Sequence, residues 1–255
     1  MLRFFRQIRQ RLLTENKFSK YLLYAIGEIL LVVIGILIAL QVDNWNENRI
    51  TENIKSQAFS NLKEDILYDI HYYKYLDSLY SKWHIQADNI YSKLLTRSMD
   101  RINSIDEYIV GRGSMNHLSV KTTTFDEMVN TGLIYKINNP QLSHSINEYY
   151  EFADLEIEKI NLDNQEFYRY ILRTSGYEYI NTGARIWHKV NLEYVDWSWL
   201  KDPKSERYMK FESRIDFHRV AIEANKLVLG QLTEKAENLL RVIDSNISSD
   251  EKVKK

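Results

Sequence analysis

The feature that most constrains this chain is a long apolar run near its N-terminus. Across Leu22–Leu40, Glu28 is the only charged residue among nineteen. Because an α-helix rises about 1.5 Å per residue, about twenty such residues span roughly 30 Å, the thickness of a bilayer core. The sequence therefore predicts one transmembrane helix at residues 21–42. Ile38-Ala39-Leu40 does not have the two small residues, two positions apart, of a cleavage site, so we expect an uncleaved signal anchor.

Charged residues are distributed unevenly around this run. Residues 1–42 hold only two acidic side chains but six basic ones, namely Arg3, Arg6, Arg9, Arg11, Lys17 and Lys20. Because basic flanks stay in the cytoplasm, we expect a cytoplasmic N-terminus and residues 43–255 on the far side. Leu2, Phe5, Ile8 and Leu12 also recur at helical spacing. This pattern favours a basic amphipathic segment at 1–20 that lies on anionic lipid over a plain topology signal.

The N-terminal region also carries a specific sequence pattern. It has a basic start, NKFSKYLLYAIGEI at 16–29, an apolar run that ends in IGILIALQ, and then NWNE at 44–47. This stretch resembles the N-terminal signature of DUF6090, a family of bacterial membrane proteins of unknown function, and Thr124–Met128, Thr131–Leu133 and Tyr149-Tyr150 resemble its later pattern. The resemblance implies the inner membrane of a Gram-negative bacterium, with residues 43–255 in the periplasm. It implies no activity, cofactor or catalytic residue.

The rest of the chain has few residues that break helices. The whole sequence contains 8 Gly and 2 Pro, and neither type lies between Gly35 and Gly111. Few breakers mean few turns, so we expect an all-α fold in which the transmembrane helix can continue outward. Apolar periodicity predicts helices at about 45–96, 124–133, 140–173 and 203–247. The short second helix is expected to be capped at Thr123 or Thr124 and stopped by Gly132.

The three long helices carry narrow apolar stripes. The mainly apolar positions from Ile66 to Leu94 and from Tyr208 to Ile247 recur in steps of three or four, as in a coiled coil. Such stripes predict an antiparallel helical bundle. Residues 174–203 differ, because they are rich in aromatic side chains and contain Asn181-Thr182-Gly183, which is typical of a turn. We expect this insertion to form a small hairpin or irregular cap on the bundle.

Motifs for catalysis and cofactor binding are missing from the sequence. There is no cysteine, no Glu-x-x-His, no His-Glu-x-x-His and no Gly-x-Ser-x-Gly, and Gly111-Arg112-Gly113 lacks the context of a phosphate loop. The chain has 34 basic and 35 acidic residues, so the basic excess within 1–42 leaves the remainder net acidic. A net-acidic domain argues against nucleic-acid binding. We expect no catalytic residue, no metal ligand, no cofactor and no nucleic-acid partner.

Two groups of residues are candidates for a site in the main domain. Polar side chains interrupt the apolar stripes at Asn164, His218 and Asn225. They either line a ligand site or pair with each other and set helix register, and we favour pairing. The insertion supplies a candidate partner surface, made of Tyr177, Tyr179, Trp187, Trp197 and Trp199. Tyr and Trp are enriched at contact surfaces, but these rings could equally form a small core that closes the bundle.

The transmembrane helix carries a third candidate. Glu28 shares one helical face with Val32, Gly35 and Ala39, in steps of four, three and four. A mid-bilayer carboxylate costs about 2.5–3.5 kcal/mol on insertion scales, so it must be protonated, hydrated or paired. Gly35 and Ala39 would let a second helix approach closely. We interpret this face as a membrane-helix contact, with a Glu28 that reaches towards interfacial water as the alternative.

Together these patterns predict a membrane-anchored periplasmic protein without enzymatic activity, acting in interaction or scaffolding. Its expected partners are membrane lipid and either a second copy or another membrane protein. The alternative is a sensory or ligand-binding module. With only about twenty residues inside the cell, such a sensor would act through a membrane partner. An enzyme is the third hypothesis, and the sequence offers no site for it.

Overall fold

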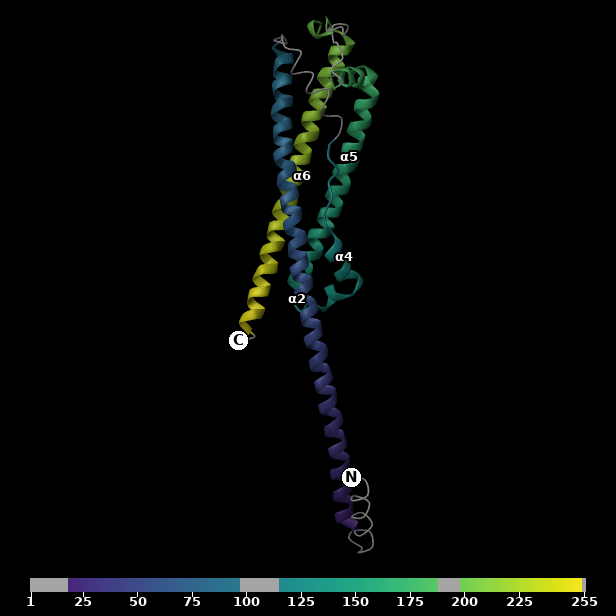
Figure 1. Cartoon of the computed structure of the whole chain (residues 1–255), viewed down its shortest axis with the longest axis vertical. Helices are drawn as coiled ribbons and strands as arrows, with labels where there is room; N and C mark the ends of the chain where they lie inside the picture. The colour runs from purple at the N-terminus through teal and green to yellow at the C-terminus, as the bar shows by residue number, and fades with distance from the viewer. Residues whose placement is uncertain (1–17, 97–114, 188–197, 254–255) are drawn as a thin grey trace. The chain divides into compact units, whose positions relative to one another are not determined.

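The computed structural model describes residues 18–96, 115–187 and 198–253, with the backbone alone at 18–21, 23–24, 171–172, 174–187 and 247–253. Its regular elements are the helices α2 (Phe18–Leu95), α4 (Thr123–Asn130), α5 (Pro140–Trp187) and α6 (Glu206–Val253), and the 3-10 turns η1 (Leu133–Lys136) and η2 (Ser198–Lys201), as Figure 1 shows. The described ranges contain no strand. The predicted all-α fold is confirmed.

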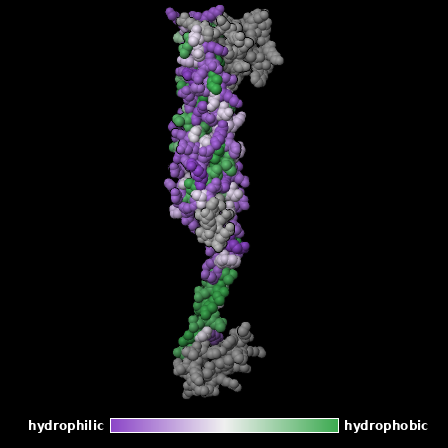
Figure 2. All heavy atoms as spheres, turned by 90° about the vertical axis from the view of Figure 1, so that its left-hand side faces the viewer, coloured by the Kyte–Doolittle hydropathy of each residue, from purple (hydrophilic) through white to green (hydrophobic). Residues whose placement is uncertain are grey.

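The chain divides into two compact units, residues 1–57 and 58–255. In the first unit, the described part is the beginning of α2. Its large apolar side chains between Leu22 and Val42 are 42–73% exposed wherever they are described, and they form the continuous hydrophobic surface of Figure 2. α2 is also the one helix among the described residues that is long and apolar enough to cross a membrane.

The second unit has its core between three helices, which meet in three clusters of buried side chains. The first cluster joins residues 62–70 of α2, 142–150 of α5 and 236–243 of α6. The second joins residues 73–80, 153–160 and 222–232 of the same helices, and the third joins 87–94 of α2 to 208–215 of α6. Residue numbers rise together along α2 and α5 but fall along α6. Therefore α6 runs opposite to α2 and α5, which share one direction (Figure 1).

Residues 115–136, which we call the strap, connect α2 to α5 along the bundle. Met115 and Leu118 belong to the second core cluster, whereas Met128 of α4 and Leu133 of η1 belong to the first. The strap therefore returns the chain along the bundle. Because of this return, α2 and α5 do not follow the antiparallel order expected for consecutive long helices.

Local side chains define where α5 and α6 begin. Pro140 opens α5, and the Asn139 side-chain oxygen accepts hydrogen bonds from the backbone of Gln141 and Leu142 (3.0 and 3.2 Å). This is an Asn N-cap followed by proline in the first turn, and the helix begins at the predicted residue 140. Ser205 caps α6 in the same way, since its hydroxyl accepts the Tyr208 N–H (3.2 Å).

Two predicted helix boundaries are wrong. α5 continues to Trp187, so the predicted end near Arg173 and the turn at 181–183 do not occur. A glycine inside a helix costs only about 1 kcal/mol relative to alanine, so Gly176 and Gly183 need not end it. The second error concerns the cap of α4: no side chain at Thr122 caps the helix, and α4 is stabilised from another helix, as described below. Gly132 does adopt the left-handed conformation expected of a stop (φ 70°).

Candidate functional site

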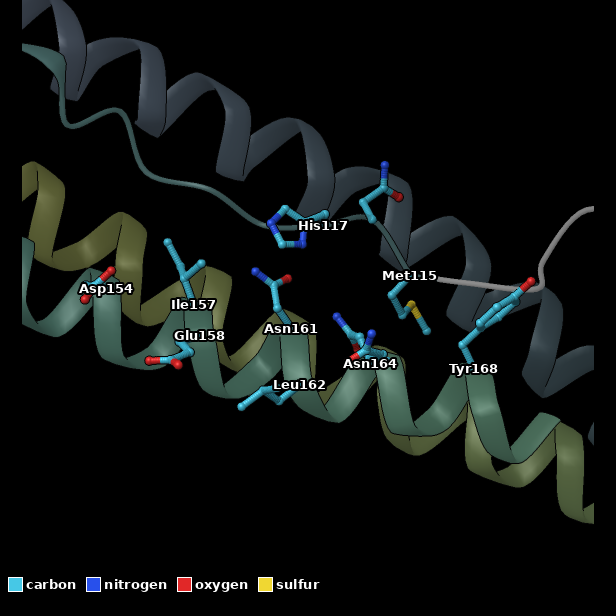
Figure 3. A pocket seen from close by; sticks show the side chains of 11 residues that line it. Met115, His117, Asp154, Ile157, Glu158, Asn161, Leu162, Asn164 and Tyr168 are labelled. Atoms are coloured by element: carbon cyan, nitrogen blue, oxygen red, sulfur yellow. The ribbon is translucent and has the colours of Figure 1, made fainter. Parts of the chain in front are cut away.

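A groove lies between the strap and α5 in the second unit. Its volume is about 570 Å³. Met115 and His117 of the strap lie opposite Asn161 and Asn164 of α5 across it (Figure 3). Asp154 and Glu158 also line it, and the lining residues include no lysine or arginine. The groove therefore has an amide-rich floor and an acidic wall.

The polar floor of the groove is internally paired. The Asn164 amide donates to the Asn225 side-chain oxygen (3.0 Å), and the Asn225 amide donates to Asn164 (2.8 Å) and to the Ala221 carbonyl (2.8 Å). Asn164 is 8% exposed and Asn225 is fully buried. This reciprocal pair joins α5 to α6 and leaves little bonding capacity for a ligand, which is the arrangement favoured from the sequence.

The third predicted core residue, His218, lies among aromatic rings. It is 2% exposed, and its ring stacks on Phe167 with centroids 5.8 Å apart and an interplanar angle of 6°. Trp83 of α2 lies on another side at 6.4 Å. All three residues are therefore buried: Asn164 and Asn225 pair between α5 and α6, whereas His218 packs against rings of α5 and α2.

The Asn164–Asn225 pair gives a direct prediction about stability. Asn225→Leu should destabilise the fold by about 1–3 kcal/mol, because it leaves the Asn164 amide buried without its partner. The double variant Asn164→Leu with Asn225→Leu should recover most of that loss, giving a coupling energy of about 1 kcal/mol or more. Denaturant unfolding of the full chain in detergent measures it. Asn147→Leu, at an exposed site of α5, is the control and should change stability by less than about 0.5 kcal/mol. Strictly additive losses would contradict the pairing.

The proposed aromatic partner surface is only partly within the described residues. Trp199 is 5% exposed and packs against Phe211 in an edge-to-face contact, with centroids 5.5 Å apart. Trp199 is therefore a core residue in this structure, so for this ring the core alternative holds and not the partner surface. Burying the ring in the third cluster removes it from solvent. Trp197 and the side chains of Tyr177, Tyr179 and Trp187 lie outside the described residues.

The membrane-helix face lies within the first unit. Val32 is 55% exposed and Glu28 is half-buried. A side chain added at Gly35 would meet nothing within 4 Å. The structure thus places Glu28, Val32, Gly35 and Ala39 on one open face of α2, and their role in a helix contact stays a prediction.

Sequence reasoning missed a pair of buried carboxylates on α2. Asp65 and Asp69 are 4% and 1% exposed and lie one helical turn apart. Asp65 accepts hydrogen bonds from the Thr124 backbone (3.1 Å) and hydroxyl (2.6 Å), at the start of α4. It therefore caps α4 from another helix, as a carboxylate at a helix N-terminus can. The sequence does contain a signal for this pair: two aspartates lie four residues apart, beside the core positions Ile66 and Ile70.

The two carboxylates have opposite ionisation preferences. Burial alone would raise the pKa of Asp65, but hydrogen bonds from Lys121 and Thr124 outweigh it and hold that pKa below its ordinary value. Burial raises the pKa of Asp69 to about 6, because its hydrogen bonds to the Lys121 backbone and Tyr149 compensate only partly. Asp65 is therefore a stable anion near neutral pH, whereas Asp69 titrates close to it.

Comparison with known proteins identifies a family but no relative of known activity. Neither the curated proteins nor the solved structures give a match. A family model matches residues 28–181, which is more than half of the chain. The matched span contains the membrane-helix face, both carboxylates, the strap and most of α5, but not α6. As the N-terminal signature indicated, the chain belongs to DUF6090, a family of unknown function.

Proposed function

We propose that this protein is a single-pass membrane protein whose helical bundle acts as a non-enzymatic interaction or scaffold module. One observation carries the proposal. The described apolar side chains from Leu22 to Val42 are exposed on every side of α2. Such an area far exceeds the apolar patches that soluble proteins leave in water, and lipid is the environment that covers a helix on all sides.

The orientation in the membrane rests on charge. Residues 1–20 carry the six basic side chains, and Asp43, Glu47, Arg49 and Glu52 follow the apolar run. The positive-inside rule then supports a cytoplasmic N-terminus and a periplasmic domain at 43–255, in the inner membrane. Residues 1–17 of the basic amphipathic segment at 1–20 lie outside the described residues, and the association of this segment with lipid is part of the same proposal.

Within the membrane, the partner is a second transmembrane helix, supplied by another copy or by a different protein. Gly35 and Ala39 offer small side chains four residues apart, and the space beside Gly35 is open. Without a large side chain, two helix backbones can approach closely and gain packing energy. The face that includes Glu28 and Val32 is therefore the proposed contact.

A second candidate function is ligand sensing, and the groove is the observation that favours it. A volume of about 570 Å³ is within the range of small-molecule sites. Asp154 and Glu158 stand on its wall without a lysine or arginine among the lining residues. A cationic or hydroxyl-rich ligand would suit this wall, and its signal would pass to a membrane partner.

Single cysteines test the membrane arrangement, because the natural chain has none. A cysteine at Leu155, which is 61% exposed, should react in intact spheroplasts with a maleimide that cannot cross membranes. A cysteine at Arg9 should react only after lysis. Equal labelling of both, or the reverse pattern, would contradict the proposed orientation. In the same membranes, disulfide crosslinks between copies should peak at positions 28, 32, 35 and 39, with position 37 as the control. A flat profile would exclude self-association through this face.

A further inference from the structure

The strap is fastened to the bundle mainly through α2. Tyr80 accepts a hydrogen bond from the Asn116 backbone (3.0 Å), and Tyr72 donates to the His117 carbonyl (3.0 Å). On the α5 side, the Asn161 amide holds Leu118 by two hydrogen bonds of 2.9 Å, one to its N–H and one to its carbonyl. These contacts hold the first residues of the strap, and they involve neutral groups only.

The next part of the strap is held by the two carboxylates. Asp65 contacts the Lys121 ammonium (2.7 Å) as well as Thr124. Asp69 accepts the Lys121 backbone N–H with both oxygens (3.1 and 3.3 Å), and it accepts the Tyr149 hydroxyl (3.3 Å). One residue, Lys121, therefore engages both carboxylates, with its side chain on Asp65 and its backbone on Asp69.

The charges in this cluster do not balance when both carboxylates are ionised. The titratable groups that face Asp69 are Asp65 and Tyr73 on α2, Lys121 on the strap, and Tyr149 and Tyr150 on α5. Burial raises the pKa of all three tyrosines, so they are neutral. Among the described residues, Lys121 is thus the one cation that faces these two buried anions, and its ammonium pairs with Asp65. A buried anion without a paired cation is unfavourable. A proton on Asp69 neutralises its carboxylate and so removes this unpaired charge.

We propose that Asp65 and Asp69 form a latch in which Asp65 fastens the strap at all physiological pH values, whereas Asp69 fastens it more tightly when it carries a proton. A protonated Asp69 keeps its carbonyl oxygen as acceptor for the Lys121 N–H. Ionisation leaves the hydrogen bonds in place but adds a second negative charge one turn from Asp65. Acidification therefore tightens the strap at Lys121 and Thr124.

The sign and size of the effect follow from proton linkage. Asp69 has a folded pKa of about 6, above its ordinary value of 3.8, so the closed strap binds the proton more tightly than the open strap. The stabilisation that the proton on Asp69 gives to the closed strap is complete below pH 3.8 and is lost as the pH rises through 6. For these two values, the opening constant of the strap should rise about tenfold between pH 5 and pH 8.

Hydrogen exchange of the full chain in detergent tests the latch. Protection factors of peptides covering 118–128, corrected for intrinsic exchange, should be about tenfold lower at pH 8 than at pH 5. A peptide covering 222–232 of α6 is the internal control and should change by less than about twofold. Equal changes in both peptides would show global rather than local opening. Unchanged protection of the strap peptide would show that no latch responds to protons. Either result would overturn the proposal.

Two substitutions separate the roles of the carboxylates. Asp69→Asn keeps an acceptor but cannot ionise, so strap protection should become independent of pH. Asp65→Asn removes the anion that pairs with Lys121, so protection should fall about tenfold or more at both pH values. A pH response that persists in Asp69→Asn would overturn the assignment of the proton. If that variant does not fold, carbon-13 titration of the Asp69 carboxyl in the natural chain decides: a midpoint near 6 supports the latch, and one near 4 overturns it.

Discussion

Replacing Val33 and Leu37 by arginine is expected to release the protein from the membrane. Both side chains lie in the middle of the apolar run and are 42% and 58% exposed. On insertion scales, each change from an apolar residue to arginine at a helix centre costs about 3 kcal/mol, so the pair costs about 6 kcal/mol. That loss is enough to prevent stable insertion of a single helix. Alkaline extraction of membranes measures the effect, since the natural chain should stay in the pellet and the variant should not.

The matched control places the same charges on the bundle. Tyr75 and Leu155 are 64% and 61% exposed, so arginine at these positions meets water and should leave membrane retention unchanged. A Val33→Arg and Leu37→Arg protein that remained resistant to extraction would contradict anchoring by α2. Release of both double variants would instead indicate a general loss of folding.

The second large effect is expected at Trp199. Trp199→Ala should destabilise the protein by about 3–5 kcal/mol, because it removes a large ring from a closed cluster and leaves a cavity. The ring contacts Phe211, and the Arg207 guanidinium lies 4.9 Å from its centroid. Both contacts tie η2 to α6, so the loss should fall mainly on the part of the bundle where the third cluster lies. Thermal unfolding of the full chain in detergent, followed by circular dichroism, measures it.

Two exposed aromatic residues provide the controls for Trp199. Tyr135 is 84% exposed and Tyr75 is 64% exposed, and alanine at either position should change stability by about 0.5 kcal/mol or less. If Trp199→Ala behaved like these controls, the ring would be available for a partner and the third cluster would not depend on it. A pull-down with the same variants then reports whether any loss of binding is separate from a loss of stability.

The tyrosines around the strap explain why its polar contacts can be buried. Burial raises the pKa of Tyr80 to about 12, so its phenol is neutral and accepts the Asn116 N–H without adding charge. Burial also raises the pKa of Tyr149, so its neutral phenol donates a hydrogen bond to Asp69 without adding charge. Neutral partners satisfy the backbone of an extended segment at little electrostatic cost, which a carboxylate alone could not do.

Much of this protein follows from the sequence alone. The apolar run at 21–42, the all-α fold and the start of α5 at Asn139-Pro140 depend on local chemistry and helical periodicity. The DUF6090 signature is likewise a contiguous pattern. Each of these features is encoded within a few helical turns, so sequence spacing is enough to predict it.

Only the tertiary structure decided the remaining features. The shared direction of α2 and α5 depends on the path of the strap, which periodicity does not encode. Trp199 looks the same in sequence whether its ring is in a core or on a surface, and contacts with α6 decide that it is core. In the sequence, Asp65 and Asp69 have the pattern of solvent-exposed helix positions. Only the fold shows that Lys121, Thr124 and Tyr149 of other elements contact them. Long-range contacts between segments set burial and charge pairing, and burial and charge pairing determine what a carboxylate does.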